Sequence, residues 1–217
     1  MLVGITGGSG VIYGVRLLEA LKELKIETHL VMTNAAKKTL ALETTRKVSE
    51  VESLVSASYR INDIAAPPAS GSFRSRGMVV VPCSTKTLAG IANGYLADLL
   101  LRAAEATLKE RRPLIVVPRE TPLTRIHLEN MMRAADAGAV ILPAMPAFYT
   151  RPKTMENLVD FLVGKILDVF EIEHTLYGRW GGPMSARAMR VARGGFERTA
   201  EVPPQSPLCG SLAEFPL

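Results

Sequence analysis

Residues 1–16, with the sequence M-L-V-G-I-T-G-G-S-G-V-I-Y-G-V-R, decide how the rest of this chain is interpreted. The apolar run at 2–5 predicts a buried strand, and the glycines at 7–10 let the chain turn immediately after it. Apolar residues at helical spacing over 11–24 then predict a helix on the surface of a sheet. The first turn of such a helix carries unpaired N–H groups and a partial positive charge, which favour a phosphate.

The glycine pattern by itself leaves two interpretations open. It is neither the dinucleotide fingerprint G-x-G-x-x-G nor a Walker loop, because no Gly-Lys-Ser/Thr follows. The turn either cradles a phosphorylated nucleotide or simply connects a strand to a helix.

Strand and helix patterns alternate along the rest of the chain. Strands are expected at 27–32, 78–81, 113–117 and 138–142, and helices at 35–42, 48–57, 88–92, 98–109, 128–137 and 155–170. Residues 62–76 are rich in Pro, Ala, Ser and Gly and are expected to form a loop. This alternation predicts an open parallel α/β sheet in a single domain at 1–180. The Pro-, Gly- and Ser-rich segment 181–217 is expected to be an extension without a core of its own.

Composition narrows the class of protein. The 217 residues are 47% hydrophobic and 22% charged, enough for one sizeable domain. The net charge of +5 is too mild, and too little interleaved with aromatics, to indicate nucleic acid. Without a membrane-length apolar run or a secretory signal, we expect a cytoplasmic protein with no membrane partner. Cys83 and Cys209 lie far apart, and neither metal-ligand spacing nor clustered carboxylates predict a metal.

Polar side chains follow the predicted strands. The carboxyl ends of parallel strands meet at one edge of a sheet, where ligands bind. Hydroxyls and helix N-termini suit a phosphate, and Arg or Lys neutralises it, so the edge predicts anion sites for a phosphorylated cofactor and a phosphorylated substrate. The candidates are Ser9, Thr33, Ser84, Thr87, Arg119, Glu120 and Tyr149, with Lys109 and Lys165 on helices expected to reach the edge.

Several motifs together resemble the UbiX-type flavin prenyltransferases. They include G-I-T-G-G-S-G, A-P-P-A-S-G-S-F, V-P-C-S-T-K-T-L-A-G-I, L-K-E-R-R-P-L-I-V-V-P-R-E-T-P, H-L-E-N-M, G-A-V-I-L-P and P-A-F-Y, spread over residues 1–180. The resemblance implies a three-layer Rossmann-like or flavodoxin-like parallel sheet, with helices on both faces, that binds FMN. It also implies a homo-oligomer, a dodecamer, with active sites at subunit contacts.

The implied reaction transfers a dimethylallyl group from dimethylallyl phosphate to N5 and then C6 of reduced FMN, without a metal. Its product, prenylated FMN, serves UbiD-type decarboxylases in ubiquinone biosynthesis and aromatic acid decarboxylation.

The resemblance also assigns roles to residues of this chain. Lys165 stands where many relatives have Arg, so it keeps the charge but loses the bidentate fork. The residues implied to hold FMN are Gly7, Gly8, Ser9, Thr33, Ser84, Thr85, Lys86, Thr87 and Arg119. Those implied to hold the prenyl phosphate are Lys109, Arg119, Tyr149 and Lys165. The implied catalytic residues are Glu43, Lys109, Glu120 and Tyr149, and Arg102 and Trp180 are implied in the pocket wall.

Three alternatives remain open at this point. An FMN-dependent decarboxylase of the cysteine-decarboxylating kind would need a histidine near the flavin, yet His29, His127 and His174 do not follow a strand end in a suitable loop. A non-catalytic flavin carrier would not need the charged residues at the sheet edge. A Rossmann dehydrogenase would have an acidic residue closing the second strand, where this chain has Thr33.

Overall fold

The computed structural model describes residues 1–180. Met1–Gly178 form one compact unit, and Arg179–Leu217 belong to a second. The predicted extension at 181–217 lies outside the described residues. Among the helices of the described part, none is long and apolar enough to cross a membrane.

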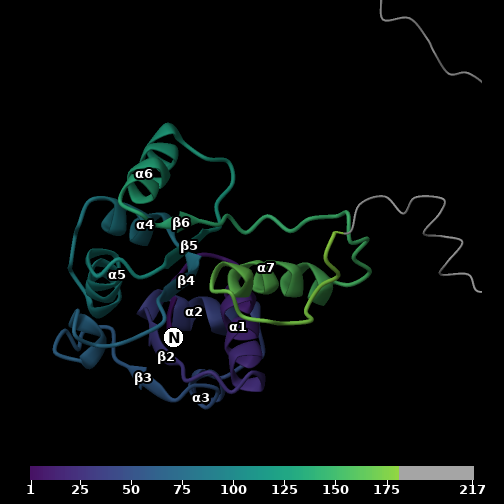
Figure 1. The fold of residues 1–217 in the computed structure, drawn as a ribbon, viewed down its shortest axis with the longest axis horizontal. Coiled ribbons are helices and arrows are strands. Elements are labelled where there is room, and N and C mark those ends of the chain that lie inside the picture. Colours follow the sequence, from purple (N-terminus) through teal and green to yellow (C-terminus); the bar gives the residue numbers. More distant parts are fainter. Residues whose placement is uncertain (181–217) are drawn as a thin grey trace, which may run out of the picture. The chain divides into compact units, whose positions relative to one another are not determined.

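Within residues 1–180, six strands form one parallel sheet in the order β3-β2-β1-β4-β5-β6 (Figure 1). The strands are β1 (Leu2–Ile5), β2 (His29–Met32), β3 (Ala57–Tyr59), β4 (Met78–Cys83), β5 (Leu114–Pro118) and β6 (Val140–Ile141). The chain builds outward from β1 in one direction and then from β4 in the other. The carboxyl ends of β1 and β4 therefore flank the point where a crevice opens in sheets of this kind.

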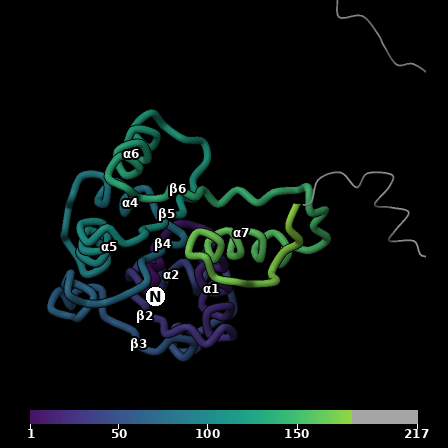
Figure 2. The backbone as a smooth tube through the Cα atoms, in the orientation of Figure 1, coloured from purple at the N-terminus to yellow at the C-terminus, as the bar shows by residue number. Residues whose placement is uncertain are grey.

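Helices cover both faces of the sheet, as the three-layer prediction requires. They are α1 (Val11–Glu23), α2 (Asn34–Glu43), α3 (Val48–Glu52), α4 (Thr85–Ala92), α5 (Leu99–Lys109), α6 (Arg125–Asp136) and α7 (Met155–Val169), with a short 3-10 helix, η1 (Pro67–Ala69). The apolar residues of α1, α2 and α7 join one core cluster, and those of α4, α5 and α6 join another. Figure 2 shows α7 lying alongside α1.

The two clusters follow from the alternation of side chains along each strand. Val79 and Val81 of β4 pack with α1 and α7, whereas Met78 and Val80 pack with α4 and α5. Every residue of β4 is buried, which explains why its sequence is a continuous apolar run.

The prediction was wrong for residues 48–57. The helix stops at Glu52, and Ala57–Tyr59 pairs in parallel with His29–Val31 as the edge strand β3. The helix predicted at 128–137 begins at Arg125, because the Thr124 side chain accepts a hydrogen bond from the His127 N–H and caps it.

Candidate active site

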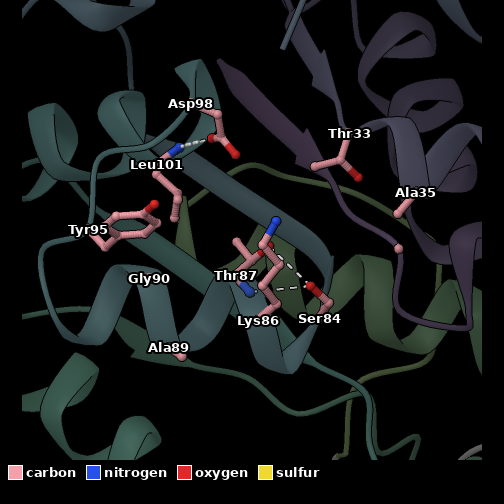
Figure 3. Close-up of a pocket in the computed structure, with 11 residues that line it drawn as sticks. Thr33, Ala35, Ser84, Lys86, Thr87, Ala89, Gly90, Tyr95, Asp98 and Leu101 are labelled. Atoms are coloured by element: carbon pink, nitrogen blue, oxygen red, sulfur yellow. Dashed lines mark hydrogen bonds between the residues drawn. The ribbon is translucent and has the colours of Figure 1, made fainter. Parts of the chain in front are cut away.

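A pocket of about 450 Å³ opens where the loops after β1, β2 and β4 meet (Figure 3). Its lining residues come from segments far apart in the sequence, as expected at the carboxyl edge of a parallel sheet. They are Gly7, Thr33, Ala35, Ser84, Lys86, Thr87, Ala89, Gly90, Tyr95, Asp98 and Leu101.

Two hydroxyl groups cap helices at this pocket. The Thr33 Oγ1 atom accepts a hydrogen bond from the Ala36 N–H at 3.0 Å and caps α2. The Ser84 Oγ atom accepts from the Thr87 N–H at 3.3 Å and caps α4. The N-termini of α2 and α4 therefore lie at the cavity, and the positive ends of their helix dipoles attract an anion there.

The loops after β1 and β4 are tied together beneath the pocket. The Thr6 hydroxyl donates to the Pro82 carbonyl oxygen at 2.8 Å and accepts from the Ser84 N–H at 2.7 Å. Thr6 is fully buried, so these two bonds satisfy a hydroxyl that has no access to water. They hold Ser84 at a fixed place relative to the glycine turn.

The glycine turn also lets α2 approach β1 closely. A Cβ atom at Gly7 would lie 2.5 Å from the Cβ of Ala35. Gly10 has a φ of 95°, in the left-handed region, and precedes α1 as its N-cap. Glycine is therefore required by the backbone at both positions, and Gly7 also lines the pocket.

The first turn of α1 is already neutralised by the chain itself. Glu43, at the end of α2, accepts hydrogen bonds through Oε2 from the N–H groups of Gly10 and Val11, at 2.8 and 3.0 Å. Burial alone would raise the pKa of the Glu43 carboxyl group, but these bonds, a hydrogen bond with Ser9 and the nearby Arg119 charge bring that pKa below its ordinary value. The phosphate predicted at this helix terminus would compete with Glu43, so the N-termini of α2 and α4, where no carboxylate of the described residues accepts from the first turn, suit it better.

Arg119 connects the glycine turn to a second cavity. Its Nε atom donates to the Ser9 carbonyl oxygen at 3.1 Å. Arg119 and Glu120 also line a cavity of about 260 Å³ with Thr121, Pro143 and Met145. This cavity follows β5 and β6, so it lies at the same edge of the sheet as the first. It provides a guanidinium group close to the glycine turn but outside the larger pocket.

The structure brings some of the predicted residues together and separates others. Gly7, Thr33, Ser84, Lys86 and Thr87 line the larger pocket, whereas Gly8, Ser9 and Thr85 do not. Glu43 contacts the glycine turn, and Arg119 and Glu120 line the second cavity.

Lys109 does not reach the pocket of its own chain. Asp98 caps the start of α5 at the pocket, accepting from the Leu101 N–H at 3.0 Å, and Lys109 is the last residue of the helix. The 11 residues of α5 rise about 16 Å, which is more than a lysine side chain can span. Lys109 instead lies 3.8 Å from the Glu105 carboxylate.

Tyr149 and Lys165 are held by α7 rather than by the pocket. The Tyr149 ring packs edge-on against Phe161, with centroids 5.9 Å apart. Lys165 lies 3.4 Å from Asp168. The carbonyl oxygen of Phe170, just beyond α7, accepts from Arg76, which precedes β4, so this end of α7 lies toward the amino edge of the sheet. The prediction that Lys165 reaches the carboxyl edge is therefore not met within one chain.

Sequence reasoning missed two polar side chains of the pocket. Tyr95 and Asp98 both line it, between α4 and α5 (Figure 3). The helix expected at 98–109 begins at Asp98, and an aspartate directly before an apolar helical run is a recognisable N-cap, so its position at the edge of the sheet could have been inferred. Tyr95 lies in an irregular loop and has no such signal.

The pocket fits FMN in size and chemistry. Its volume lies within the range of small-molecule sites, and it offers two cap hydroxyls and the Lys86 ammonium for a phosphate. Tyr95, Leu101 and Ala89 supply apolar surface for a ring system. Among the residues that the structure describes, no group of three or more His, Cys, Asp or Glu side chains could hold a metal ion. The fold and this pocket define the class as an α/β protein that binds a phosphorylated nucleotide at the sheet edge.

Comparisons with known proteins give the family. Residues 1–175 match the family described as Flavoprotein. Flavin prenyltransferase UbiX of Thauera aromatica is 49% identical over 182 residues, covering 84% of this chain and 94% of the relative. A crystal structure of AnUbiX (PadA1) in complex with FMN and dimethylallyl pyrophosphate is 49% identical, with a TM-score of 0.82, and covers 83% of this chain and 96% of that chain. The chain belongs to the UbiX flavin prenyltransferases of the flavoprotein family.

Two other structures bear on the predictions. The dodecameric FMN-dependent UbiX-like decarboxylase of Escherichia coli O157:H7 is 49% identical, with a TM-score of 0.82, over 83% of this chain and 98% of that chain. The peptidyl-cysteine decarboxylase EpiD is only 17% identical, with a TM-score of 0.56 over 76% of this chain and 96% of that chain. The second likeness shows the fold alone and does not favour the cysteine-decarboxylase alternative.

Proposed function

We propose that this protein is a flavin prenyltransferase that transfers a dimethylallyl group to reduced FMN. The observation that carries the proposal is the pocket of helix caps at the sheet edge, in a chain about half identical to relatives named for this activity. When bound, reduced FMN supplies an electron-rich ring as the prenyl acceptor, at N5 and C6. Residues of the chain bind the phosphates, stabilise the developing charge and accept a proton.

The phosphate of FMN is assigned to the caps of α2 and α4. The Thr33 and Ser84 hydroxyls and the exposed N–H groups of these helix termini bind it without burying a full positive charge. Lys86, in the first turn of α4, neutralises part of its charge.

Arg119 and Glu43 act at the other side of the glycine turn. Arg119 stabilises the phosphate leaving group as negative charge develops on it. The lowered pKa of Glu43 keeps its carboxyl group ionised at neutral pH, so as a catalytic residue it accepts a proton rather than donates one. Glu120, whose Oε1 atom accepts from the Thr121 N–H at 3.1 Å, is assigned to the phosphate side of the same site.

Lys109, Tyr149 and Lys165 keep their predicted roles only if other subunits supply them. Each is held away from the larger pocket of its own chain. The relative from Escherichia coli O157:H7 is dodecameric, which supports an assembly in which sites form between subunits. We therefore assign these three residues to the prenyl phosphate in the assembled oligomer.

Further parts of the proposal extend beyond the chain. We propose dimethylallyl phosphate as the donor, a UbiD-type decarboxylase as the recipient of prenylated FMN, a cytoplasmic location, and an FMN-binding domain at 1–180. Comparing dimethylallyl phosphate with the diphosphate as substrates tests the donor directly.

A single experiment tests the central reaction. Purified protein is incubated without oxygen with reduced FMN and dimethylallyl phosphate, and the flavin product is analysed by mass spectrometry. The proposal predicts a flavin heavier by one dimethylallyl unit, absent when the prenyl phosphate is omitted. Normal FMN binding with no adduct from either phosphate donor would leave a flavin carrier and refute the transferase.

A further inference from the structure

A partly buried polar cluster lies at the end of α7, and its residues line neither cavity. The Asp168 Oδ1 atom lies 3.1 Å from His174 Nε2, and its Oδ2 atom lies 3.4 Å from Lys165 Nζ. The Tyr177 hydroxyl donates to the same Oδ2 atom. Of these four residues, only Lys165 has a role in the proposed reaction.

The hydrogen bonds of His174 identify the atom that carries its proton. Its Nδ1 atom accepts from the Leu176 N–H at 3.2 Å, so the proton of the neutral ring lies on Nε2 and is directed at Asp168. The side chain of His174 is 2% exposed and that of Asp168 is 15% exposed. The carboxylate is thus fixed by an imidazole and a phenol, independently of the lysine.

The cluster depends on close packing against α7. A Cβ atom at Gly164 would lie 2.5 Å from the Tyr177 ring and 2.7 Å from that of His174, so glycine is needed for the segment to approach. The Tyr177 ring in turn packs on Phe161, with centroids 4.9 Å apart, and Phe161 packs on Tyr149. Lys165 and Tyr149 are therefore both connected to this packed cluster, Lys165 through Asp168 and Tyr149 through Phe161.

We propose that Asp168 is a positioning residue for the prenyl phosphate and that it acts through Lys165. This inference rests on the proposed function, which assigns Lys165 and Tyr149 to that phosphate. A lysine has a flexible stem and no planar fork, so it loses much rotamer freedom when it binds an anion. The fixed carboxylate restrains the ammonium beforehand and occupies only one of its three donors.

Charge neutralisation by Asp168 is the competing effect. A carboxylate beside Lys165 lowers the net positive charge that the phosphate meets. Here the carboxylate also accepts hydrogen bonds from His174 and Tyr177, and the Lys165 side chain remains 45% exposed, so its ammonium is available to a ligand. Restraint therefore outweighs neutralisation, and removing the carboxylate weakens phosphate binding.

A double-mutant cycle in the assembled protein tests the proposal. Asp168→Asn, Lys165→Ala and the double variant are compared for the KM of dimethylallyl phosphate, kcat and the Kd of FMN. Asp168→Asn should raise the KM about three- to tenfold in the wild-type background and leave it unchanged in the Lys165→Ala background. The Kd of FMN should be the same in all variants.

Two further variants test whether a raised KM in Asp168→Asn reflects only a loss of folding. Tyr177→Phe keeps the ring but removes one hydrogen bond to Asp168, so it should raise the KM in the same direction by a smaller factor. Glu23→Gln removes an ion pair at 3.2 Å from Arg16 on α1 and serves as the matched control, with no change in KM.

Each other outcome overturns the proposal. Additive effects of Asp168→Asn and Lys165→Ala would mean that the cluster only anchors residues 172–177. An unchanged or lowered KM in Asp168→Asn and Tyr177→Phe would mean that neutralisation dominates. An unchanged KM in Lys165→Ala would remove Lys165 from the phosphate site, yet adduct formation by the wild-type protein would still support the transferase.

Discussion

Glu43 places its Oε2 atom 2.8 Å from the backbone nitrogen of Gly10, so the carboxylate that ends α2 neutralises the start of α1. The same oxygen also accepts from the Val11 N–H. This contact joins two segments 33 residues apart around the glycine turn. It makes the geometry of that turn dependent on the charge of Glu43.

The first prediction concerns the pH dependence of stability. Because the pKa of Glu43 is lowered on folding, its contribution is complete at neutral pH and is lost as the pH falls through that lowered pKa, below the ordinary glutamate value of about 4.3. Glu43→Gln should lower the free energy of unfolding near neutral pH by about 0.3–1 kcal/mol, since the contact is with an exposed helix terminus.

Urea unfolding of both proteins from about pH 7 to about pH 3 measures this effect. The difference between them should shrink as the pH falls. A difference that stays constant over the range would show that the charge of Glu43 does not stabilise α1.

Gly7→Ala should disturb both the fold and the pocket. The new Cβ would lie 2.5 Å from Ala35 Cβ, which forces α2 away from β1 and moves the Thr33 cap. We expect a loss of about 1–3 kcal/mol in the free energy of unfolding, typical of overpacking, together with weaker FMN binding.

Gly8→Ala is the matched comparison for folding. A Cβ there would have its nearest neighbour at 3.6 Å, an ordinary contact. Thermal unfolding should therefore be nearly unchanged in Gly8→Ala. Equal destabilisation of both variants would contradict the steric argument.

The sequence predicted the layers of the fold better than its short elements. A continuous apolar run such as 78–81 is typical of a strand buried on both faces, and the structure confirms this run as part of β4. The edge strand at Ala57–Tyr59 has three residues and is half exposed, so it carries no such run; the helix predicted at 48–57 overlaps it only at Ala57. Its pairing with β2 depends on tertiary contacts that local pattern does not record.

The site was predictable where chemistry and local structure coincide. Thr33 and Ser84 are polar cap residues directly after apolar strands, so both the hydroxyl and its place at the sheet edge follow from the sequence. The positions of Lys109 on α5 and Lys165 on α7 were harder to predict, because a sequence motif does not show which edge of the sheet its end of the helix lies near. For Lys109, the length of α5 alone would have placed it far from the Asp98 end.

Ser84→Ala tests whether Ser84 binds FMN in addition to capping α4. The loss of the cap should cost about 1 kcal/mol of stability. If Ser84 also binds the phosphate of FMN, the Kd of FMN should rise by about tenfold, the effect of one lost hydrogen bond to a charged group.

Thr124→Ala is the control for this change. Thr124 caps α6 through a hydrogen bond of the same length, 3.3 Å, but does not line either cavity. It should lose similar stability with an unchanged Kd for FMN, measured by flavin fluorescence. An unchanged Kd in Ser84→Ala as well would remove Ser84 from the cofactor site.

The last prediction concerns the separation of Lys109 from Arg119. Lys109 ends α5, whereas Arg119 follows β5 at the carboxyl edge, so within one chain they serve opposite edges of the sheet. If both bind one prenyl phosphate, they must come from different subunits. Lys109→Ala and Arg119→Ala should each be nearly inactive alone, yet coexpression should restore activity in about one site in four, because random mixing in a symmetric oligomer reunites the intact residues. Prenyl transfer by the mixed, purified oligomer measures this recovery. Activity no higher than in either single variant would place both residues in the same chain's site, or remove Lys109 from the site altogether.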